Sequence, residues 1–546
     1  MDLLRKFERV VKIALIVMLI VSAGLISAWL LSANKKEEPD VSLGGAAEQN
    51  EVSSNTRLAD KLDLLPDKCT LNMDLSNLTF SGEDGEKIAL SGLRGKTVIL
   101  NFWASWCPYC NSELEQWRDI RERLSQYSNV EMLLVNKLDN NKETKAQALD
   151  YLKKNQIPFE NVYDEGLKVY DQLGLKVIPT TLVIDGQGLL RAWHAGKDMK
   201  PELLKSMVDY AVHGSAYETF NFLDKEMINR DGGVRTNYLP EKVSDLRYTD
   251  VLSESQGLLM EYAVNTENKS LFEKSFNYVN KNMHDNPLAA WVVTDKGPAK
   301  VNSTLDDLRI FRALYNAEKL WGGYADTIRN YERALYRYNT YKQNLINQYD
   351  FKYRKKSDSL KLCFADFEAM QYLAELNPRW KEIYTNSLAI VKDGYIGDVF
   401  PVYYPEYVIA GKTYKKEDIN MAEGMVTLLH LAKIGQLKPQ TLEWLKTAVE
   451  GEGIYARYRA DGTVVDGYNY ESTAIYGLVG MIAAAAGDKE LANRAQARME
   501  TMRVFDSGNK VNGAFGNPDG TGIYSFDQCI ALLSYSVAGK DTRQAL

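Results

Sequence analysis

The chain has 546 residues, which is too many for one ordinary hydrophobic core, so two or three domains are expected. Apolar residues make up 45% and charged residues 25%, the balance of a globular protein. The net charge of −7, without a basic block beyond the first twelve residues, argues against a nucleic-acid partner. Five cysteines in this length exclude a disulfide-rich scaffold, and Cys69, Cys363 and Cys529 are expected to be buried apolar side chains.

The N-terminal region predicts a membrane anchor. Residues 13–31 are nineteen residues without a charge, about the length of a helix that crosses a bilayer. Four basic residues precede this segment, and residues 35–38 after it carry no net charge. The positive-inside rule therefore places the N-terminus in the cytoplasm and the rest of the chain outside. We predict a cytoplasmic N-terminus and single-pass anchor over residues 1–33, followed over residues 34–60 by a flexible linker rich in Glu, Ser, Asn and Gly.

A cleaved signal peptide and a buried core helix are the alternatives to this anchor. The small residues near Ala33 form a poor cleavage site, and no cysteine follows for lipid attachment. The length and position of the segment oppose a core helix. The favoured interpretation is thus a cell-membrane protein with most of its chain extracytoplasmic.

Residues 61–213 alternate short apolar runs with amphipathic ones. The pattern predicts, in chain order, a buried strand at 97–103, a helix at 112–127, a strand at 131–135, a helix at 146–155 and a strand at 180–185. Strands that alternate with helices imply a sheet covered by helices.

Cys107 and Cys110 lie where the first of these strands gives way to a helix. A helix N-terminus carries unpaired N–H groups and about half a positive charge, and both favour thiolate over thiol. Cys107 is then expected to be the attacking sulfur and Cys110 the resolving one. A zinc site would need two more Cys or His ligands, and the chain has only four His, none of them near. Two inert core cysteines would not need this spacing.

The motif WASWCPYC, together with VIPT at residues 177–180 ahead of a strand, resembles the thioredoxin fold. Within that fold, residues 62–213 are similar to membrane-anchored, extracytoplasmic thiol–disulfide reductases of the cytochrome-maturation type. The resemblance implies that Pro179 is cis and packs beside the active disulfide, and that Trp106 and Pro108 support the redox site.

Two positions of this motif leave alternatives open. The Pro108-Tyr109 pair differs from the Gly-Pro of thioredoxin, so the direction of electron flow stays undetermined. Glu113 could tune the thiols or occupy the first helical turn, where acids are favoured, and the second interpretation is preferred.

Residues 214–546 have few strand-like runs and many Tyr. Helical stretches are predicted at 257–264, 269–283, 305–320, 324–346, 367–391, 419–434, 473–486 and 525–538. Paired helices over this length predict a closed helical toroid or a helical solenoid. The loops carry the Gly, Asp, Tyr and Pro, so a site is expected at the helix ends.

Acidic residues begin two of these helices: Glu254 in SESQGLLM, and Asp306 and Asp307 in NSTLDDL. Singly, such residues cap helices or complement the helix dipole. Together with Ala290-Trp291 and with GYNYE at residues 467–471, however, these segments resemble glycoside hydrolase family 8 in order and spacing over residues 220–535. The resemblance implies an all-α (α/α)6 barrel that hydrolyses β-1,4-linked glycans with inversion.

This resemblance also assigns roles. Glu254 falls on the family's general acid, and Asp306 and Asp307 fall at the element whose acid holds the sugar at the cleavage point. The family's usual base is replaced by Asn469, and an amide cannot accept a proton from water. One branch of the family, including chitosanases, takes its base from a loop, and a comparable stretch here contains further acids. The base or substrate-binding candidates are Asn469, Glu406, Glu417, Asp418, Trp291 and Tyr468.

The predicted protein therefore combines a C-x-x-C thiol–disulfide oxidoreductase with an inverting endo-glycosidase-like domain. Its expected partners are a β-1,4-linked polysaccharide (glucan, chitosan or exopolysaccharide), a redox partner protein and the membrane, and no metal or cofactor is expected. In the alternative hypothesis the helical domain has lost catalysis and is a glycan- or protein-binding scaffold. Asn469, and Ser472 in place of the family's Arg, favour this alternative, and Glu254 opposes it.

Overall fold

The computed structural model describes residues 68–538, except residues 70, 118–119, 121–123, 125–126, 128, 198, 215, 241, 244–245 and 507. The predicted anchor and linker therefore lie outside the described residues. Within the described ranges, no helix is both long enough and apolar enough to cross a membrane.

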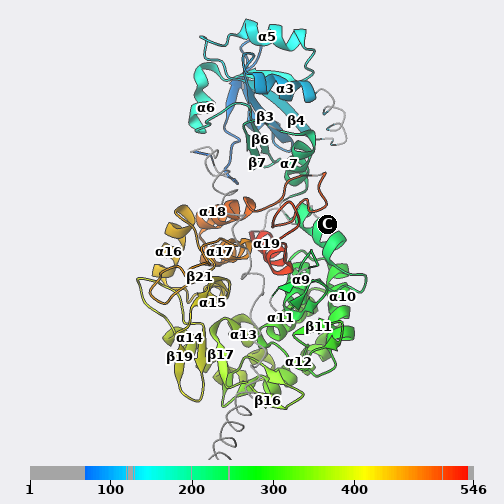
Figure 1. Cartoon of the computed structure of the whole chain (residues 1–546), viewed down its shortest axis with the longest axis vertical. Helices are drawn as coiled ribbons and strands as arrows, with labels where there is room; N and C mark the ends of the chain where they lie inside the picture. Colours follow the sequence, from blue (N-terminus) through cyan, green and yellow to red (C-terminus); the bar gives the residue numbers. More distant parts are fainter. Residues whose placement is uncertain are drawn as a thin grey trace, which may run out of the picture. The chain divides into compact units, whose positions relative to one another are not determined.

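A seven-stranded sheet organises the first part of the described chain (Figure 1). Its order is β2-β1-β5-β4-β3-β6-β7, and the interior strand β3 runs parallel to β4 and antiparallel to β6. The strands are β1 (Thr79–Ser81), β2 (Lys87–Ala89), β3 (Thr97–Trp103), β4 (Val130–Asn136), β5 (Glu160–Tyr163), β6 (Thr180–Ile184) and β7 (Leu190–Ala195). The α-helices are α3 (Pro108–Gln116), α5 (Lys145–Lys154), α6 (Lys168–Gln172) and α7 (Pro201–His213), and short 3-10 turns follow β2 and β5 at Leu90–Leu93 and Glu165–Leu167.

Strand β3 is buried on both faces, which explains its unbroken apolar run. Ile99 and Trp103 pack into the core on one face, whereas Val98, Leu100 and Phe102 pack into a separate core on the other. This alternation is the period of two of an extended chain. The predicted strands and helices are found, but the first helix spans Pro108–Gln116 and not 112–127. Proline is well suited to the first helical position because no N–H is needed there.

Six helices form a closed ring in the described part of the larger region (Figure 1). Each ring helix contacts the next one along the chain, and the last contacts the first. The ring helices are α9 (Ser253–Asn265), α11 (Thr304–Trp321), α13 (Phe367–Leu376), α15 (Met421–Lys433), α17 (Thr473–Ala486) and α19 (Ser525–Ala538). A closed ring of this kind is what an (α/α)6 toroid requires, and it excludes an open solenoid.

Further helices follow five of the ring helices in sequence. These are α10 (Lys269–Tyr278), α12 (Ala325–Tyr338), α14 (Trp380–Asp393), α16 (Pro439–Glu450) and α18 (Lys489–Glu500); α8 (Tyr217–Phe222) precedes the ring, and π-turns occur at Leu223–Met227 and Val279–Met283. The apolar pattern of the sequence distinguishes the ring helices from the helices that follow them. Every residue of α17 from Thr473 to Ala483 is buried, whereas α12 buries one face only. A helix that is apolar on all sides belongs inside, and an amphipathic one outside.

The loops are strongly unequal at the two ends of the ring helices. Connections that leave a ring helix are short, at residues 266–268, 322–324, 377–379, 434–438 and 487–488. Connections that lead into the next ring helix are long, at residues 284–303, 339–366, 394–420, 451–472 and 501–524. The long loops therefore gather where the ring helices begin, which is the end that carries Glu254 and Asp306.

Short strand pairs stiffen these long loops and the segment that leads into α9. They are β8 (Lys242–Val243), β9 (Leu246–Arg247), β10 (Val251–Leu252), β11 (Val292–Thr294), β12 (Gly297–Pro298), β13 (Thr340–Tyr341), β14 (Asn344–Leu345), β15 (Tyr349–Asp350), β16 (Lys355–Lys356), β17 (Ser359–Lys361), β18 (Glu406–Val408), β19 (Thr413–Lys415), β20 (Ile419–Asn420) and β21 (Arg457–Tyr458), with a 3-10 turn, η6, at Leu362–Phe364. Long functional loops in compact domains commonly carry such local order.

Two predicted helices were too long. The stretch 367–391 is two helices, α13 and α14, because Pro378 disfavours helical backbone at Asn377 before it. The stretch 324–346 ends as a helix at Tyr338 and continues as the hairpin of β13 and β14. Lys342 and Gln343 at the tip of that hairpin both have positive φ, at 48° and 54°. Neither residue type announces such a turn in a sequence.

Candidate functional site

The cysteine pair caps the first helix of the sheet domain. Cys107 and Cys110 are joined by a disulfide, and Cys107 is the N-cap residue of α3. The Cys107 sulfur accepts the backbone N–H of Cys110 at 3.2 Å, so it meets one of the unpaired N–H groups of the helix start. Both cysteines are nearly buried, with Cys107 the more exposed of the two.

Trp106, Pro108 and Pro179, which were expected to support the redox site, lie around the disulfide. The Ile178-Pro179 peptide bond is cis, and the carbonyl oxygen of Ile178 lies 3.8 Å from the Cys107 sulfur. Pro108 is the first residue of α3. Trp106 and Tyr109 flank the cysteines and are 48% and 56% exposed, so they offer an accessible apolar rim.

Glu113 does not occupy the first helical turn, and the preferred interpretation of this residue was wrong. Because α3 begins at Pro108, Glu113 lies in its second turn, where its side chain is buried. Burial raises the pKa of Glu113 to about 8, although a 2.9 Å hydrogen bond from Asn101 Nδ2 acts in the opposite direction. The side chain therefore changes charge near neutral pH, inside the core that holds the disulfide.

Replacement of Glu113 by Gln is expected to stabilise the sheet domain at alkaline pH. A buried acid with a raised pKa makes the folded state hold its proton between about pH 4.5 and pH 8, so wild-type stability falls as the pH rises through that window. Gln keeps the hydrogen bond from Asn101 and cannot ionise. Thermal unfolding should give equal midpoints for the two proteins below pH 4.5 and a higher midpoint for the variant at pH 8. The free energy of unfolding at pH 8 should be larger for the variant by about 2 kcal/mol or more. A difference that does not change with pH would contradict this origin.

Glu254 and Asp306 are brought together at the starts of neighbouring ring helices α9 and α11. Both side chains are 4% exposed. Arg309 Nη1 lies 3.5 Å from Glu254 Oε1 and 3.5 Å from Asp306 Oδ1, so those two oxygens can be at most twice that distance apart. Ser253 Oγ also donates to Asp306 Oδ2 at 2.7 Å.

Burial raises the pKa of Asp306, while Arg309 and the hydroxyl of Ser253 act in the opposite direction. A buried carboxyl group with a raised pKa beside a charged partner is a candidate for a functional site. The site is therefore suited to proton transfer.

Asp307 has a different task from Asp306. It is fully buried, and its carboxylate accepts hydrogen bonds from the backbone N–H of Ala289 at 3.0 Å and from Asn302 Nδ2 at 2.7 Å. Burial raises the pKa of Asp307 well above its usual value. Asp307 therefore anchors the loop that carries Trp291, and its oxygens are occupied within the fold.

Trp291 lies next to the acid pair through its backbone. Its carbonyl oxygen accepts the backbone N–H of Ser253 at 3.0 Å, and the half-buried ring packs against Leu252 and Val292. Tyr468 is also half-buried, beside Tyr470, and the Arg457 guanidinium lies over its ring.

The candidates for the second acid lie in three different environments. Glu406 is buried in β18. It accepts a hydrogen bond from Asn347 Nδ2 at 3.0 Å and forms an ion pair with Lys415 Nζ at 2.6 Å, which is typical of a structural role. Glu417 and Asp418 are exposed, and so is Asn469 in the loop before α17.

Two buried groups at this end of the ring were not predicted from the sequence. Arg309 follows Asp306 by one helical turn, a spacing that was visible but carried no motif. Asp527 in α19 accepts hydrogen bonds from Ser472 Oγ at 3.2 Å and from the backbone N–H of Ala474 at 2.8 Å, so it caps the neighbouring helix α17. Burial raises the pKa of Asp527 to about 6.

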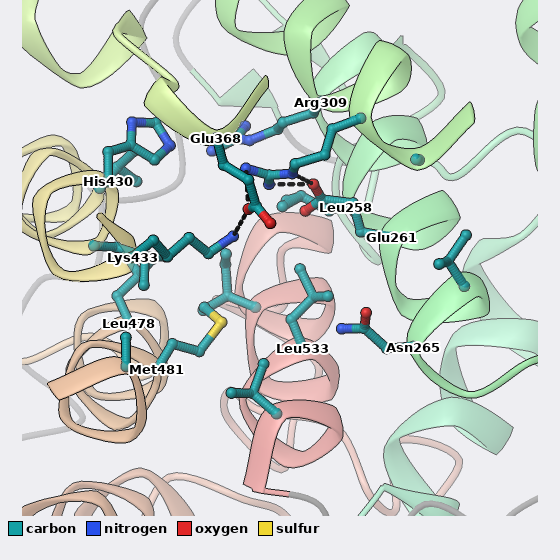
Figure 2. A pocket seen from close by; sticks show the side chains of 18 of the residues that line it. Leu258, Glu261, Asn265, Arg309, Glu368, His430, Lys433, Leu478, Met481 and Leu533 are labelled. Atoms are coloured by element: carbon teal, nitrogen blue, oxygen red, sulfur yellow. Dashed lines mark hydrogen bonds and ion pairs between the residues drawn. The ribbon is translucent and has the colours of Figure 1, made fainter. Parts of the chain in front are cut away.

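A cavity of about 290 Å³ lies inside the ring and is lined by residues of all six ring helices (Figure 2). Its wall is mainly apolar, with one charged region around Arg312. Arg312 pairs with Glu261, with Asp366 at 2.5 Å and with Glu368 at 3.4 Å. Lys433 Nζ lies 3.0 Å from the same Oε2 oxygen of Glu368, so two cations meet three carboxyl groups in this network.

Comparison with known proteins agrees with this division of the chain. Residues 71–193 match the AhpC/TSA family, which identifies them as a thioredoxin-like domain. This domain has homologues among thiol–disulfide oxidoreductases: the thiol-disulfide oxidoreductase ResA of Halalkalibacterium halodurans is 32% identical over 120 residues, 22% of this chain and 65% of that protein.

The helical part is similar to other proteins. The protein YdaJ of Bacillus subtilis is 24% identical over 321 residues, 57% of this chain and 84% of that protein. A solved structure described as a novel alpha-amylase from Clostridium perfringens aligns with a TM-score of 0.56 and 27% identity over 60% of this chain and 98% of its own. The chain thus joins a thioredoxin-like domain to a large helical domain that resembles a glycosidase.

Proposed function

We propose that this protein is a membrane-anchored, extracytoplasmic fusion of a thiol–disulfide oxidoreductase and an inverting endo-glycosidase. The anchor is residues 13–31, and the proposed polysaccharide is β-1,4-linked: a glucan, chitosan or an exopolysaccharide. Resistance of the full chain to extraction from membranes by alkaline carbonate would support the anchor, and release by that wash would oppose it.

The redox proposal rests on Cys107 as the N-cap of α3. The Cys107 thiolate would attack a client disulfide and form a mixed disulfide, and the Cys110 thiolate would then attack the Cys107 sulfur and release the reduced client. The helix N-terminus stabilises the thiolate of Cys107 more than that of Cys110, because the N–H groups point at the cap residue. Iodoacetamide near pH 7 should label Cys107 of the reduced protein faster than Cys110, as read by mass spectrometry of a time course. Equal and slow labelling of both residues would contradict this assignment.

The glycosidase proposal rests on one observation: two buried carboxyl groups, Glu254 and Asp306, share Arg309 at the end of the ring where the long loops gather. Glu254 would protonate the leaving oxygen and Asp306 would hold the sugar at the cleavage point. In an inverting enzyme a second carboxylate activates water from the opposite face, which requires a separation of about 6.5–9.5 Å. The likeness to the Clostridium perfringens structure supports a glycan substrate.

The substrate test uses the full chain with cellulose, mixed-linkage glucan, xylan, chitosan, poly-glucosamine and starch. Release of new reducing ends from a β-1,4-linked polymer, with the product anomer inverted in early NMR spectra, would support the proposal. Starch is included because the similar structure carries the name of an amylase. Cleavage of starch alone would overturn the β-linkage, and no shortening of any polymer would overturn the catalytic function.

A second candidate function is a scaffold that binds glycan without cleaving it. The exposed amide of Asn469 favours it, since this position carries the base in the resembled family. Co-sedimentation with an insoluble polysaccharide, without new reducing ends after prolonged incubation, would support the scaffold. Cleavage of the same polymer would exclude it.

A further inference from the structure

Arg309 reaches the acid pair from the inner side of the ring. It lies one turn after Asp306 in α11, it is 3% exposed, and its carboxylate partners come from two different helices. Figure 2 shows Arg309 among the residues that line the cavity within the ring.

Helix α9 packs closely against α11 at this arginine because residue 257 is a glycine. A Cβ atom added at Gly257 in α9 would meet the Cβ atom of Arg309 at 3.2 Å, which is closer than ordinary contact. The two helices therefore lie close together where Gly257 faces the start of the Arg309 side chain. This approach brings the start of α9, with Glu254, within reach of the guanidinium.

The neighbouring arginine on the same helix has other partners. Arg312 is compensated by Glu261, Asp366 and Glu368. The charge of Arg309 is instead directed to Glu254 and Asp306. The two arginines of α11 thus pair with different acids.

The other titratable groups near this cluster add little net charge, and Lys361 and the buried Glu423 pair with each other at 3.3 Å. Burial raises the pKa of the thiols of Cys363 in η6 and Cys529 in α19, and it lowers the pKa of His430 in α15 to about 3. These three groups are uncharged at neutral pH. Asp307 has a raised pKa from burial, and Asp366 is held by Arg312.

We infer that Arg309 is a positioning residue of the glycosidase site, which holds the carboxyl groups of Glu254 and Asp306 in place and sets the pH range over which they work. This inference rests on the proposed function of Glu254 and Asp306. Arg309 touches the two acids from the interior of the ring and takes no part in proton transfer itself.

The sign of the effect follows from the charge. A cation within about 4–6 Å favours the ionised form of a carboxyl group by about one to three pKa units. Removal of Arg309 therefore makes both carboxyl groups harder to ionise. The alkaline limb of the pH profile of kcat/KM, which the proton donor Glu254 sets, should move to higher pH in Arg309→Met by about one unit or more.

The test compares wild type, Arg309→Met, Arg309→Lys and Arg329→Met on the polymer that wild type cleaves best. Arg329 is a matched control, because its ion pair with Asp326 lies on the exposed face of α12. Arg309→Lys keeps the charge and should retain the wild-type pH limbs, with a kcat lowered about tenfold or more by the lost geometry. Arg329→Met should match wild type in both respects. A profile of Arg309→Met that superposes on that of wild type would overturn the inference.

A stability arm separates this inference from the proposed function. In Arg309→Met, two buried carboxyl groups lose their cation, so its loss of unfolding midpoint relative to wild type should grow from pH 4.5 to pH 8. Adding Glu254→Gln to Arg309→Met should recover part of that loss at pH 8. If wild type cleaves no polymer but this pattern is observed, the proposed function is wrong and the pairing of Arg309 with the two acids is confirmed. A loss that is independent of pH and of Glu254→Gln overturns that pairing.

Discussion

Replacement of Glu254 by Gln is expected to reduce polysaccharide cleavage by a factor of about 10² to 10⁴. Gln preserves the size of the side chain but cannot donate a proton to the leaving oxygen. Because Glu254 is 4% exposed and lies at the start of α9 beside Arg309, no solvent-exposed acid can take its place. The measurement is the rate of reducing-end release at saturating polymer, with folding checked by circular dichroism.

Glu452→Gln is the matched control for this loss. Glu452 lies in the long loop that leads into α17, its side chain is exposed, and it is not among the site candidates. It should leave the rate within a factor of about two, because the same chemical change is made outside the proposed site. Retention of more than a tenth of the wild-type rate by folded Glu254→Gln would remove Glu254 from the role of proton donor.

Replacement of Arg312 by Met is expected to destabilise the helical domain by about 3–5 kcal/mol. It leaves the fully buried Asp366 without its nearest cation and removes the partner of Glu261. Breaking one side of a buried ion pair is costly because the remaining charge cannot be solvated. Chemical denaturation at neutral pH measures this loss, and Arg329→Met, at an exposed pair, should cost less than about 1 kcal/mol.

The same variant has a pH signature. Burial alone would raise the pKa of Asp366, but Arg312, with smaller contributions from His430 and Lys433, brings it below its usual range. Because the pKa of Asp366 is lower in the folded than in the unfolded protein, its ionisation stabilises the wild-type fold above the unfolded pKa. This stabilisation is lost as the pH falls through the folded pKa. Without Arg312 the acid can escape its charge by protonation, so the penalty should shrink between pH 7 and pH 4.5. A penalty that is constant over this range would show that lost packing, rather than charge, is its source.

The local features of this fold were predictable from the sequence because each depends on residues that are close in the chain. Helices α17 and α19 begin and end where the apolar pattern placed them, and the strand–helix seam with Cys107 follows from one strand and one cap. The errors were also local in kind. Pro378 divides one predicted helix, and two residues with positive φ close a hairpin that no turn residue announces.

The candidate site divides in the same way. Glu254 and Asp306 were identified from motifs, each at a helix start. Their shared ion pair with Arg309 was not predicted. Asp527 was not predicted for the same reason, since its partner Ser472 directly precedes another ring helix, α17. Glu113 was placed in the wrong turn, and burial rather than the helix dipole governs it.

By itself, the sequence determined which segments are strands and helices, where sulfur and carboxyl groups meet helix starts, and which class of chemistry each part supports. Only the tertiary structure decided which acids share a cation, which are occupied in holding loops, and which end of the ring carries the site. The physical reason is that periodicity and capping act over one or two helical turns, whereas the environment of a buried charge depends on segments that meet only when the ring closes.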